Sequence, residues 1–311
     1  MKLHHFRDVV AIAERGSLRA AARYLQLAQP ALTRSLGELE AELGVLLFER
    51  QARGMTLTPV GHSFIQRAKA ILHEVRRAKE ETDQLQGGAA GSVTVGLSIA
   101  PHITILPKVL GPFRARYPAV RLHVIEGFYS NLESGLQDGS IDFVIGPAPE
   151  RPVSAGLLQE LLFANLRTIL CRNGHPLSAV GSLAELAGAE WATTSVTLRA
   201  EEEMGELFER HGLAPPRLAL RSQSALTLMI ALAHSDLLAM VPMQWKEFTP
   251  AAGLMTTIRV RERLPAPNIV LIRRAGLPLT PAANSLLDLM RTAARETAPI
   301  PKGRARGGHL A

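Results

Sequence analysis

Apolar positions in the first sixty residues follow two helical periods separated by a short break. Leucine and alanine recur three or four positions apart over residues 18–25 and again over 32–43, the spacing of one buried helix face. Only residues 26–28 separate the two runs. Two short helices joined by so tight a turn predict a helix-turn-helix, a unit whose second helix can enter the major groove of DNA.

Flanking residues extend this unit on both sides. A first helix is expected over residues 3–15, and Ser17 is suited to cap the next helix. The second helix of the pair is expected over 30–43, since proline is tolerated in a first helical turn. Residues 45–50 and 55–57 then flank a polar turn, which predicts a two-stranded wing.

A long helix is predicted over residues 59–86. Its apolar positions are spaced alternately four and three residues apart, which is typical of a coiled-coil seam. The seam consists of Phe64, Ala68, Ile71, Val75, Ala78, Thr82 and Leu85. A single amphipathic helix packed on its own domain would show the same spacing. Because the positions outside the seam are mostly polar, we favour a helix that pairs with a second copy of the chain.

The pattern changes after the glycine-rich segment 87–91, which predicts a flexible linker and a domain boundary. Beyond it strands and helices alternate, as expected of an α/β fold with βαβ units and a doubly wound parallel sheet. Strands are expected at 93–97, 121–126, 141–145, 167–171, 191–194, 217–220, 237–241, 254–259 and 268–272. Helices are expected at 101–117, 131–137, 183–187, 200–211, 225–233 and 281–295.

Composition and charge add little to this picture. The chain has 311 residues, of which 20% are charged and 47% hydrophobic, ordinary values for a globular protein. Its net charge of +7 gives only weak support for nucleic-acid binding. No apolar run is long enough for a membrane span, and the first residues lack the apolar core of a signal peptide, so we expect a cytoplasmic location.

Reactive groups point away from enzyme chemistry. Cys171 is the only cysteine, which excludes an intrachain disulfide and a cysteine-pair metal site. We interpret Cys171 as a small apolar residue on a strand, with a redox-sensing thiol as the alternative. The sequence contains no GxSxG, GxGxxG, P-loop or HExxH pattern. We therefore expect no catalysis, no metal site and no cofactor.

Polar residues gather at the start of the second helix of the predicted pair. Gln29, Pro30, Thr33 and Arg34 lie at its N-terminal end, off the leucine face. Arginine pairs with guanine, glutamine with adenine, and threonine contacts the thymine methyl group. Arg53, at the tip of the wing, would reach a minor groove or a phosphate. Phosphates would repel the acidic residues at the far end of the helix, so the N-terminal end should face DNA.

Many residues of this block match one family of regulators. The matching residues in the first part are Gly16, Ser17, Leu18, Ala20, Ala21, Ala22, Leu25, Leu39, Glu40, Leu43, Gly44, Leu57, Thr58 and Gly61, with the segments 28–34 and 47–50. Further matches are Leu106, Pro107, Phe113, Tyr117, Pro118, Val241 and Pro242, with the segment 139–142. On these residues the chain resembles the LysR-type transcriptional regulators over essentially its whole length. Two departures are Thr33, where serine is commoner, and Gly37, where a long polar residue is usual.

The resemblance implies a winged helix-turn-helix head over 1–58 and a dimerising linker helix with a hinge over 59–91. It also implies a two-lobed effector domain like a periplasmic binding protein. Lobe I is expected from 92–163 with 268–300 and lobe II from 164–267, before a disordered tail at 301–311. The family's DNA contacts map onto Gln29, Pro30, Thr33, Arg34 and Arg53. Segments near 233–236 and 277–281 are similar to a subgroup linked to aromatic sulfonate or sugar catabolism.

In such lobes the ligand lies at the carboxyl ends of the strands. This predicts an effector site formed by Ser98, Ile99, Ala100, Pro101, His102, Gly146, Pro147, Thr194, Ser195, Thr197, Gln223 and Ser224. Ser98 precedes a helix N-terminus, where backbone N–H groups favour an anion, and the threonines would add hydroxyl donors. A small organic anion, such as a carboxylate or sulfonate, is therefore expected. Ser98 acting only as a helix cap, and His102 as an ordinary loop residue, remain open.

We interpret the chain as a ligand-responsive transcriptional regulator. A dimer of dimers would bind an interrupted palindrome in double-stranded DNA, contacting RNA polymerase when it activates, and the effector would shift how the heads are presented. The alternative is a small-molecule-binding protein whose head is an interaction module without specific DNA recognition. An enzyme in the two-lobed domain is a more distant alternative.

Overall fold

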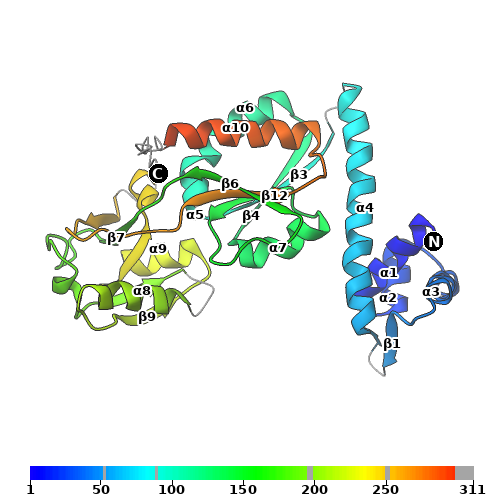
Figure 1. Ribbon diagram of the computed structural model, residues 1–311, viewed down its shortest axis with the longest axis horizontal. Helices are drawn as coiled ribbons and strands as arrows, with labels where there is room; N and C mark the ends of the chain where they lie inside the picture. The colour runs from blue at the N-terminus through cyan, green and yellow to red at the C-terminus, as the bar shows by residue number, and fades with distance from the viewer. Residues whose placement is uncertain (52–53, 88–89, 195–198, 249–252, 298–311) are drawn as a thin grey trace, which may run out of the picture.

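The computed structural model describes residues 1–51, 54–87, 90–194, 199–248 and 253–297. It shows a small helical head, a long helix and an α/β part that contains two β-sheets (Figure 1). Three of the predicted site residues, Arg53, Ser195 and Thr197, and the expected tail at 301–311 lie outside the described residues. None of the described helices is long and apolar enough to cross a membrane.

The head packs three helices around one small core. They are α1 (Leu3–Arg15), α2 (Leu18–Leu25) and α3 (Gln29–Leu43). Val9, Ile12 and Leu32 are completely buried where the helices meet, as the helical period predicts. The hydroxyl of Ser17 accepts a hydrogen bond from the backbone N–H of Ala20 at 3.2 Å and caps α2. The expected helix-turn-helix is present.

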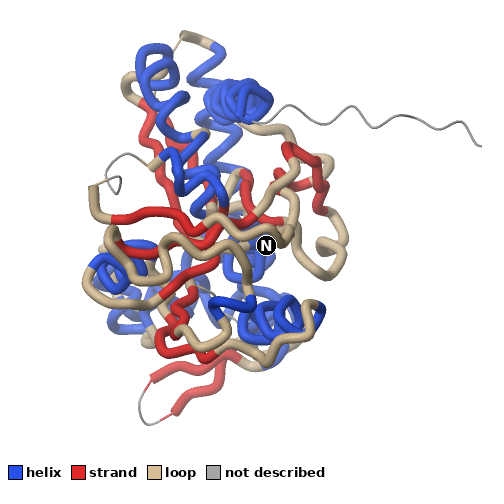
Figure 2. Tube along the Cα trace, turned by 90° about the vertical axis from the view of Figure 1, so that its left-hand side faces the viewer, coloured by secondary structure: helices blue, strands red, loops and turns tan. Residues whose placement is uncertain are grey.

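A two-stranded wing follows these helices. It consists of the antiparallel strands β1 (Phe48–Gln51) and β2 (Gly54–Leu57). The wing projects from the body of the molecule (Figures 1 and 2). Its first strand begins at Phe48 rather than at the predicted residue 45, because Val45 and Leu46 are exposed outside the ladder. The carboxylate of Glu40 accepts the backbone N–H groups of Leu47 at 2.7 Å and of Phe48 at 3.2 Å, and so fixes where the strand starts.

The long helix α4 (Pro59–Leu85) packs against both the head and the α/β part. Its N-terminal half lies on the head, where Phe64 stacks on Phe6 with ring centroids 5.9 Å apart and Ala68 is completely buried. Its C-terminal half contacts the α/β part (Figure 1). The first two positions of the predicted seam are therefore used within the chain. The later positions are half-buried Val75 and exposed Ile71, Ala78, Thr82 and Leu85.

The first of the two sheets has the strand order β4-β3-β5-β12-β6. Its strands are β3 (Gly91–Leu97), β4 (Val120–Glu126), β5 (Phe143–Pro147), β6 (Leu157–Phe163) and β12 (Ile269–Arg274). The predicted parallel arrangement holds for β3, β4 and β5, but β12 runs antiparallel to both of its neighbours. Strand β6 is absent from the prediction because its leucines do not alternate between two environments: Leu158 and Leu161 are both exposed.

The second sheet has the strand order β11-β7-β10-β8-β9. Its strands are β7 (Arg167–Arg172), β8 (Glu190–Thr193), β9 (Arg217–Arg221), β10 (Leu238–Pro242) and β11 (Met255–Ile258). Here β7 is the strand that runs antiparallel to its neighbours. The chain crosses between the sheets twice, from β6 to β7 and from β11 to β12. As a result, the N-terminal ends of β7 and β12 lie beside the carboxyl ends of β10 and β5.

Helices flank these sheets, and α6 and α10 lie side by side on the first (Figure 1). They are α5 (Ile99–Thr104), α6 (Leu106–Arg116), α7 (Tyr129–Asp138), α8 (Arg199–Arg210), α9 (Ala225–Ala233) and α10 (Pro281–Thr297), with the 3₁₀ turns η1 (Ala184–Leu186) and η2 (Met243–Glu247). The single helix predicted over 101–117 is wrong. It is divided at Ile105, because Pro107 lacks the N–H that would continue the ladder. The helix predicted over 183–187 is only a 3₁₀ turn.

Two glycines of the head should respond oppositely to alanine. A Cβ at Gly61 would lie 2.0 Å from the carbonyl oxygen of Leu47, whereas a Cβ at Gly37 would meet nothing within 4 Å. We expect Gly61→Ala to destabilise the head by about 1–3 kcal/mol through the forced backbone shift. Gly37→Ala should stabilise it by about 0.5–1 kcal/mol, since the flexibility of glycine weakens a helix. Urea unfolding of both variants measures this, and an equal effect of the two would contradict it.

Candidate functional site

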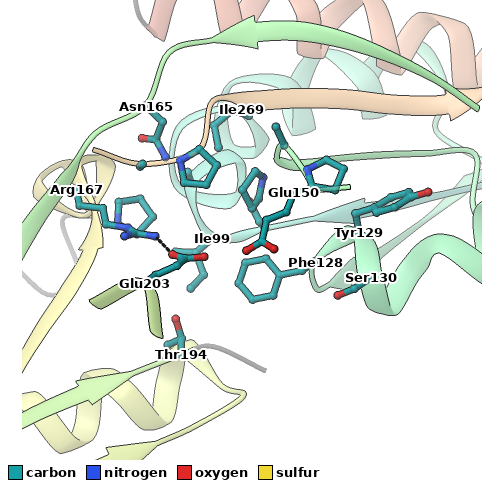
Figure 3. A pocket seen from close by; sticks show the side chains of 18 of the residues that line it. Ile99, Phe128, Tyr129, Ser130, Glu150, Asn165, Arg167, Thr194, Glu203 and Ile269 are labelled. Carbon is teal, nitrogen blue, oxygen red and sulfur yellow. Dashed lines mark hydrogen bonds and ion pairs between the residues drawn. The ribbon is translucent and has the colours of Figure 1, made fainter. Parts of the chain in front are cut away.

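A cavity of about 720 Å³ lies between the two sheets (Figure 3). Its walls come from the start of α5, the start of α7, the loop after β5, the start of β7 and helix α8. The apolar part of the lining includes Ile99, Phe128, Met204, Met240 and Ile269. A cavity of this size, mostly apolar with a few polar groups, is the usual form of a small-molecule site.

Half of the predicted effector residues lie at this site. Ser98, Ile99, Ala100, Pro147 and Thr194 line the large cavity. Gln223 lines a smaller cavity of about 100 Å³ that shares Ser98, Ile99 and Thr194 with it. The described lining of the two cavities does not include Pro101, His102, Gly146 or Ser224.

The residues outside the lining have local structural roles. The hydroxyl of Ser224 accepts the backbone N–H of Thr227 at 3.3 Å and caps α9. The Nδ1 of His102 lies 2.9 Å from the carbonyl oxygen of Ser98, within its own helical turn. Gly146 makes room for Ser98, because a Cβ at Gly146 would lie 3.3 Å from the Cβ of Ser98.

Ser98 has a hydroxyl that is not used for capping. The residue occupies the N-cap position of α5 and is only 4% exposed, but within the described chain its side chain makes no capping hydrogen bond. Its backbone N–H donates to the carbonyl of Ile145 at 3.0 Å, which fixes the residue at the end of β3. Of the two interpretations of Ser98, this geometry favours a hydroxyl available to a ligand.

The charged lining is the main feature that the sequence analysis missed. The carboxylate of Glu203 pairs with the guanidinium of Arg167 at 2.6 Å, and Glu150 lies on the loop after β5 (Figure 3). Arg151 follows Glu150 on this loop and also lines the cavity. Arg167 was missed because it opens the antiparallel strand β7. The prediction considered only the carboxyl ends of parallel strands, whereas β7 reaches the cavity with its N-terminal end.

A third carboxylate is held within the wall by hydroxyl groups. The hydroxyl of Tyr129 donates to Glu133 at 2.7 Å, and the hydroxyl of Ser154 donates to the same oxygen. Burial raises the pKa of the Tyr129 hydroxyl, so this group stays protonated and remains a donor. Glu133 is therefore a fixed part of the wall.

The N-terminal end of α3 is open to solvent. Gln29, Pro30 and Arg34 are exposed, and Arg34 forms no ion pair with any described residue. The hydroxyl of Thr33 donates to the carbonyl of Gln29 at 3.0 Å, which leaves its methyl group as the free part of the side chain. At the other end of α3, the carboxylate of Glu40 is turned to the wing.

A buried ionic cluster joins α4 to the first sheet. The guanidinium of Arg77 donates to Asp142 at 2.8 Å, to the carbonyl of Gly139 at 2.9 Å and to Glu74 at 3.1 Å. Glu74 also accepts from Arg274 at 2.7 Å. Burial raises the pKa of Asp142, although Arg77 and the backbone N–H of Thr94 oppose the shift.

Comparison with known proteins identifies the family. Residues 86–295 match the model of the LysR substrate binding domain, and residues 3–62 match the bacterial regulatory helix-turn-helix protein, lysR family. The chain belongs to the LysR family of transcriptional regulators. It is a DNA-binding regulator with an effector-binding domain, and the family consists of regulators rather than enzymes.

Individual relatives span nearly the whole chain. The HTH-type transcriptional regulator GbpR of Azospirillum brasilense is 28% identical over 296 residues, covering 94% of this chain and 86% of that protein. The SDS degradation transcriptional activation protein of Pseudomonas sp. (strain ATCC 19151) is 28% identical over 303 residues, covering 96% and 98%. The crystal structure of CbnR, a LysR family transcriptional regulator, has the same fold, with a TM-score of 0.67 and 24% identity over 94% of this chain and 99% of that chain.

Cys171 should be chemically inert in the native protein. The side chain is completely buried, and burial raises the pKa of its thiol to about 11. Because only the thiolate is nucleophilic, we expect negligible alkylation by iodoacetamide at pH 8 in the folded state and full alkylation after denaturation. Mass spectrometry of both samples measures this. Rapid native alkylation would favour the redox-sensing interpretation instead.

Proposed function

We propose that the chain is a one-component regulator that senses a small organic anion in the cavity between its two sheets. The observation that carries this proposal is the lining. It combines the Ser98 hydroxyl, which makes no helix-capping hydrogen bond, with the guanidinium groups of Arg151 and Arg167 beside an apolar wall. Arginine binds carboxylates and sulfonates through two parallel hydrogen bonds, and the apolar wall would bind the remainder of the molecule.

Carboxylates in the same lining do not exclude an anion. Glu133 already accepts two hydroxyl donors, Glu203 is paired with Arg167, and Glu150 has an interaction partner of its own. The name of the SDS degradation relative refers to an alkyl sulfate, which agrees with an amphipathic anion and with the suggested sulfonate subgroup. In this proposal lobe I comprises 92–163 with 268–300 and lobe II comprises 164–267.

The proposed output is sequence-specific binding to an interrupted palindrome. Gln29, Pro30, Thr33 and Arg34 form the reading end of α3, and Arg53 would contact the flanking backbone or minor groove. The solvent exposure of Gln29, Pro30 and Arg34 supports this role. Contact with RNA polymerase during activation belongs to the same proposal.

We further propose a dimer of dimers built from two separate surfaces. One is the exposed part of the α4 seam, including Ile71 and Leu85. The other combines exposed apolar residues of the edge strand β4 and of α9, which belong to different lobes. They are Val124, Ile125, Leu226 and Ile230. A second copy related by a two-fold axis would cover both patches at once, each lobe meeting the opposite lobe of its partner.

Arg34→Ala tests DNA reading. Losing a bidentate base contact should weaken binding to the specific site by about 1–3 kcal/mol, or roughly fivefold to more than a hundredfold. The oligomeric size in gel filtration should not change. Gel shifts with the DNA upstream of the chain's own gene measure the loss, and Arg210→Ala removes an equal charge in α8 as the control. Equal specific binding by the wild type and Arg34→Ala would mean that Arg34 does not read bases, whereas no specific shift by either protein would favour the interaction-module alternative.

Ser98→Ala tests the effector site. A thermal-shift screen of carboxylates, sulfonates and sugars first identifies a stabilising compound, since a ligand that prefers the folded state raises Tm. Removing a hydrogen bond to a charged ligand should weaken its binding by about 1.5–3 kcal/mol, while DNA binding without ligand persists. Ser178→Ala, outside the cavity, is the control. If only neutral sugars stabilise the protein, the proposed anion is wrong.

A further inference from the structure

The Arg167–Glu203 pair lies where the chain enters the second sheet. Arg167 is the first residue of β7, and its backbone N–H donates to the carbonyl of Leu264 at 2.9 Å. Its guanidinium points into the cavity and donates to the carboxylate of Glu203 in α8 at 2.6 Å (Figure 3). Phe128 and Ser130 lie across the cavity from the pair, whereas the side chain of Tyr129 points away from it (Figure 3).

This pair is not needed to hold α8 in place. The helix is anchored by Met204, Leu207 and Phe208, all buried, and the ring of Phe208 packs edge-on against Trp191 at 5.6 Å. The side chains of Arg167 and Glu203 are 23% and 39% exposed, and ion pairs in contact with water contribute little to stability. Glu203 can therefore rotate away from Arg167 without movement of the helix.

The guanidinium also has unused donors. A guanidinium carries five N–H groups, and the described contacts of Arg167 use one of them, in the single bond to Glu203. A planar carboxylate or a sulfonate can accept two parallel bonds from the same fork. An oxyanion of a ligand would thus accept two hydrogen bonds from Arg167, where Glu203 accepts one.

We propose that Glu203 occupies, in the ligand-free protein, the position on Arg167 that the anionic group of the effector takes. This rests on the proposed function, because it requires an anionic effector. Binding then replaces one anionic group on Arg167 with another: the ligand oxygens pair with Arg167, and the carboxylate of Glu203 turns toward solvent. Arg167 is the residue that selects an anion, and Glu203 sets the concentration at which the regulator responds.

The charge of Glu203 should weaken anion binding in two ways. It competes for Arg167, and after displacement it still repels the ligand across the cavity. Glu203→Gln removes both effects and keeps the shape of the side chain. We expect it to bind carboxylates and sulfonates about two- to fivefold more tightly, the range that corresponds to a partly exposed ion pair.

The experiment measures the binding of sodium benzoate and sodium p-toluenesulfonate to the full chain by calorimetry. Benzyl alcohol and benzylamine are the neutral and cationic probes. Glu203→Gln should bind both anions more tightly than the wild type, and Arg167→Gln should bind them at least tenfold more weakly than Glu203→Gln does. Glu206→Gln, on the same helix but outside the cavity lining, should match the wild type. Glu203→Gln should also keep the Tm of the wild type, because α8 is anchored elsewhere.

Three results would overturn the proposal. If the wild type binds an anion in a Ser98-dependent manner but neither Glu203→Gln nor Arg167→Gln changes its affinity, the proposed function stands and this inference fails. If Glu203→Gln abolishes binding of benzylamine, Glu203 is itself a receptor for a cation, and both proposals fail. If Glu203→Gln binds neither anion, Arg167 is not an oxyanion receptor even when it is freed.

Discussion

The burial of Arg77 against Asp142 determines how the linker helix meets the rest of the molecule. Two opposite charges that are removed from water stabilise each other only at short range and with good hydrogen-bond geometry. The raised pKa of Asp142 indicates that the desolvation of its carboxylate outweighs the attraction of Arg77. Such a pair adds little net stability, but breaking it by removing one partner costs about 3–5 kcal/mol. The cluster therefore specifies one position of α4 on the first sheet.

That sheet links the cluster to the cavity. Asp142 immediately precedes β5, and its second carboxylate oxygen accepts the backbone N–H of Thr94 in β3. Strand β5 ends at Pro147, and Ser98 directly follows β3; both residues line the cavity. Arg274 ends a third strand, β12, which begins at the cavity with Ile269. The linker helix and the ligand site are thus held by opposite ends of the same strands. A change of lobe orientation at the cavity has a direct mechanical path to α4.

Local periodicity was sufficient to predict the head and the long helix, because the side chains that define them are neighbours along one helix face. Part of the cavity followed from the rule for parallel strands, which located Ser98, Pro147 and Thr194. Arg167 and Glu203 could not be found in this way. Arg167 reaches the cavity only because β7 runs antiparallel, and Glu203 lies 36 positions further along the chain than its partner Arg167. Strand β6 was missed for a local reason, because its leucines do not alternate between buried and exposed positions: Leu158 and Leu161 are both exposed.

Helix α4 packs on the head with one half and on the first sheet with the other. The helix has 27 residues, so at about 1.5 Å per residue it is roughly 40 Å long. Its N-terminal half is held on the head, where Ala68 is completely buried. Its C-terminal half is held on the first sheet by the bond from Arg77 to Asp142. If the first sheet tilts by about 10°, α4 tilts with it. The N-terminal end of the helix then moves by about 7 Å, roughly two base-pair steps of about 3.4 Å each. In the proposed regulator this helix would be a lever arm, through which a small change of lobe angle would shift the head along DNA.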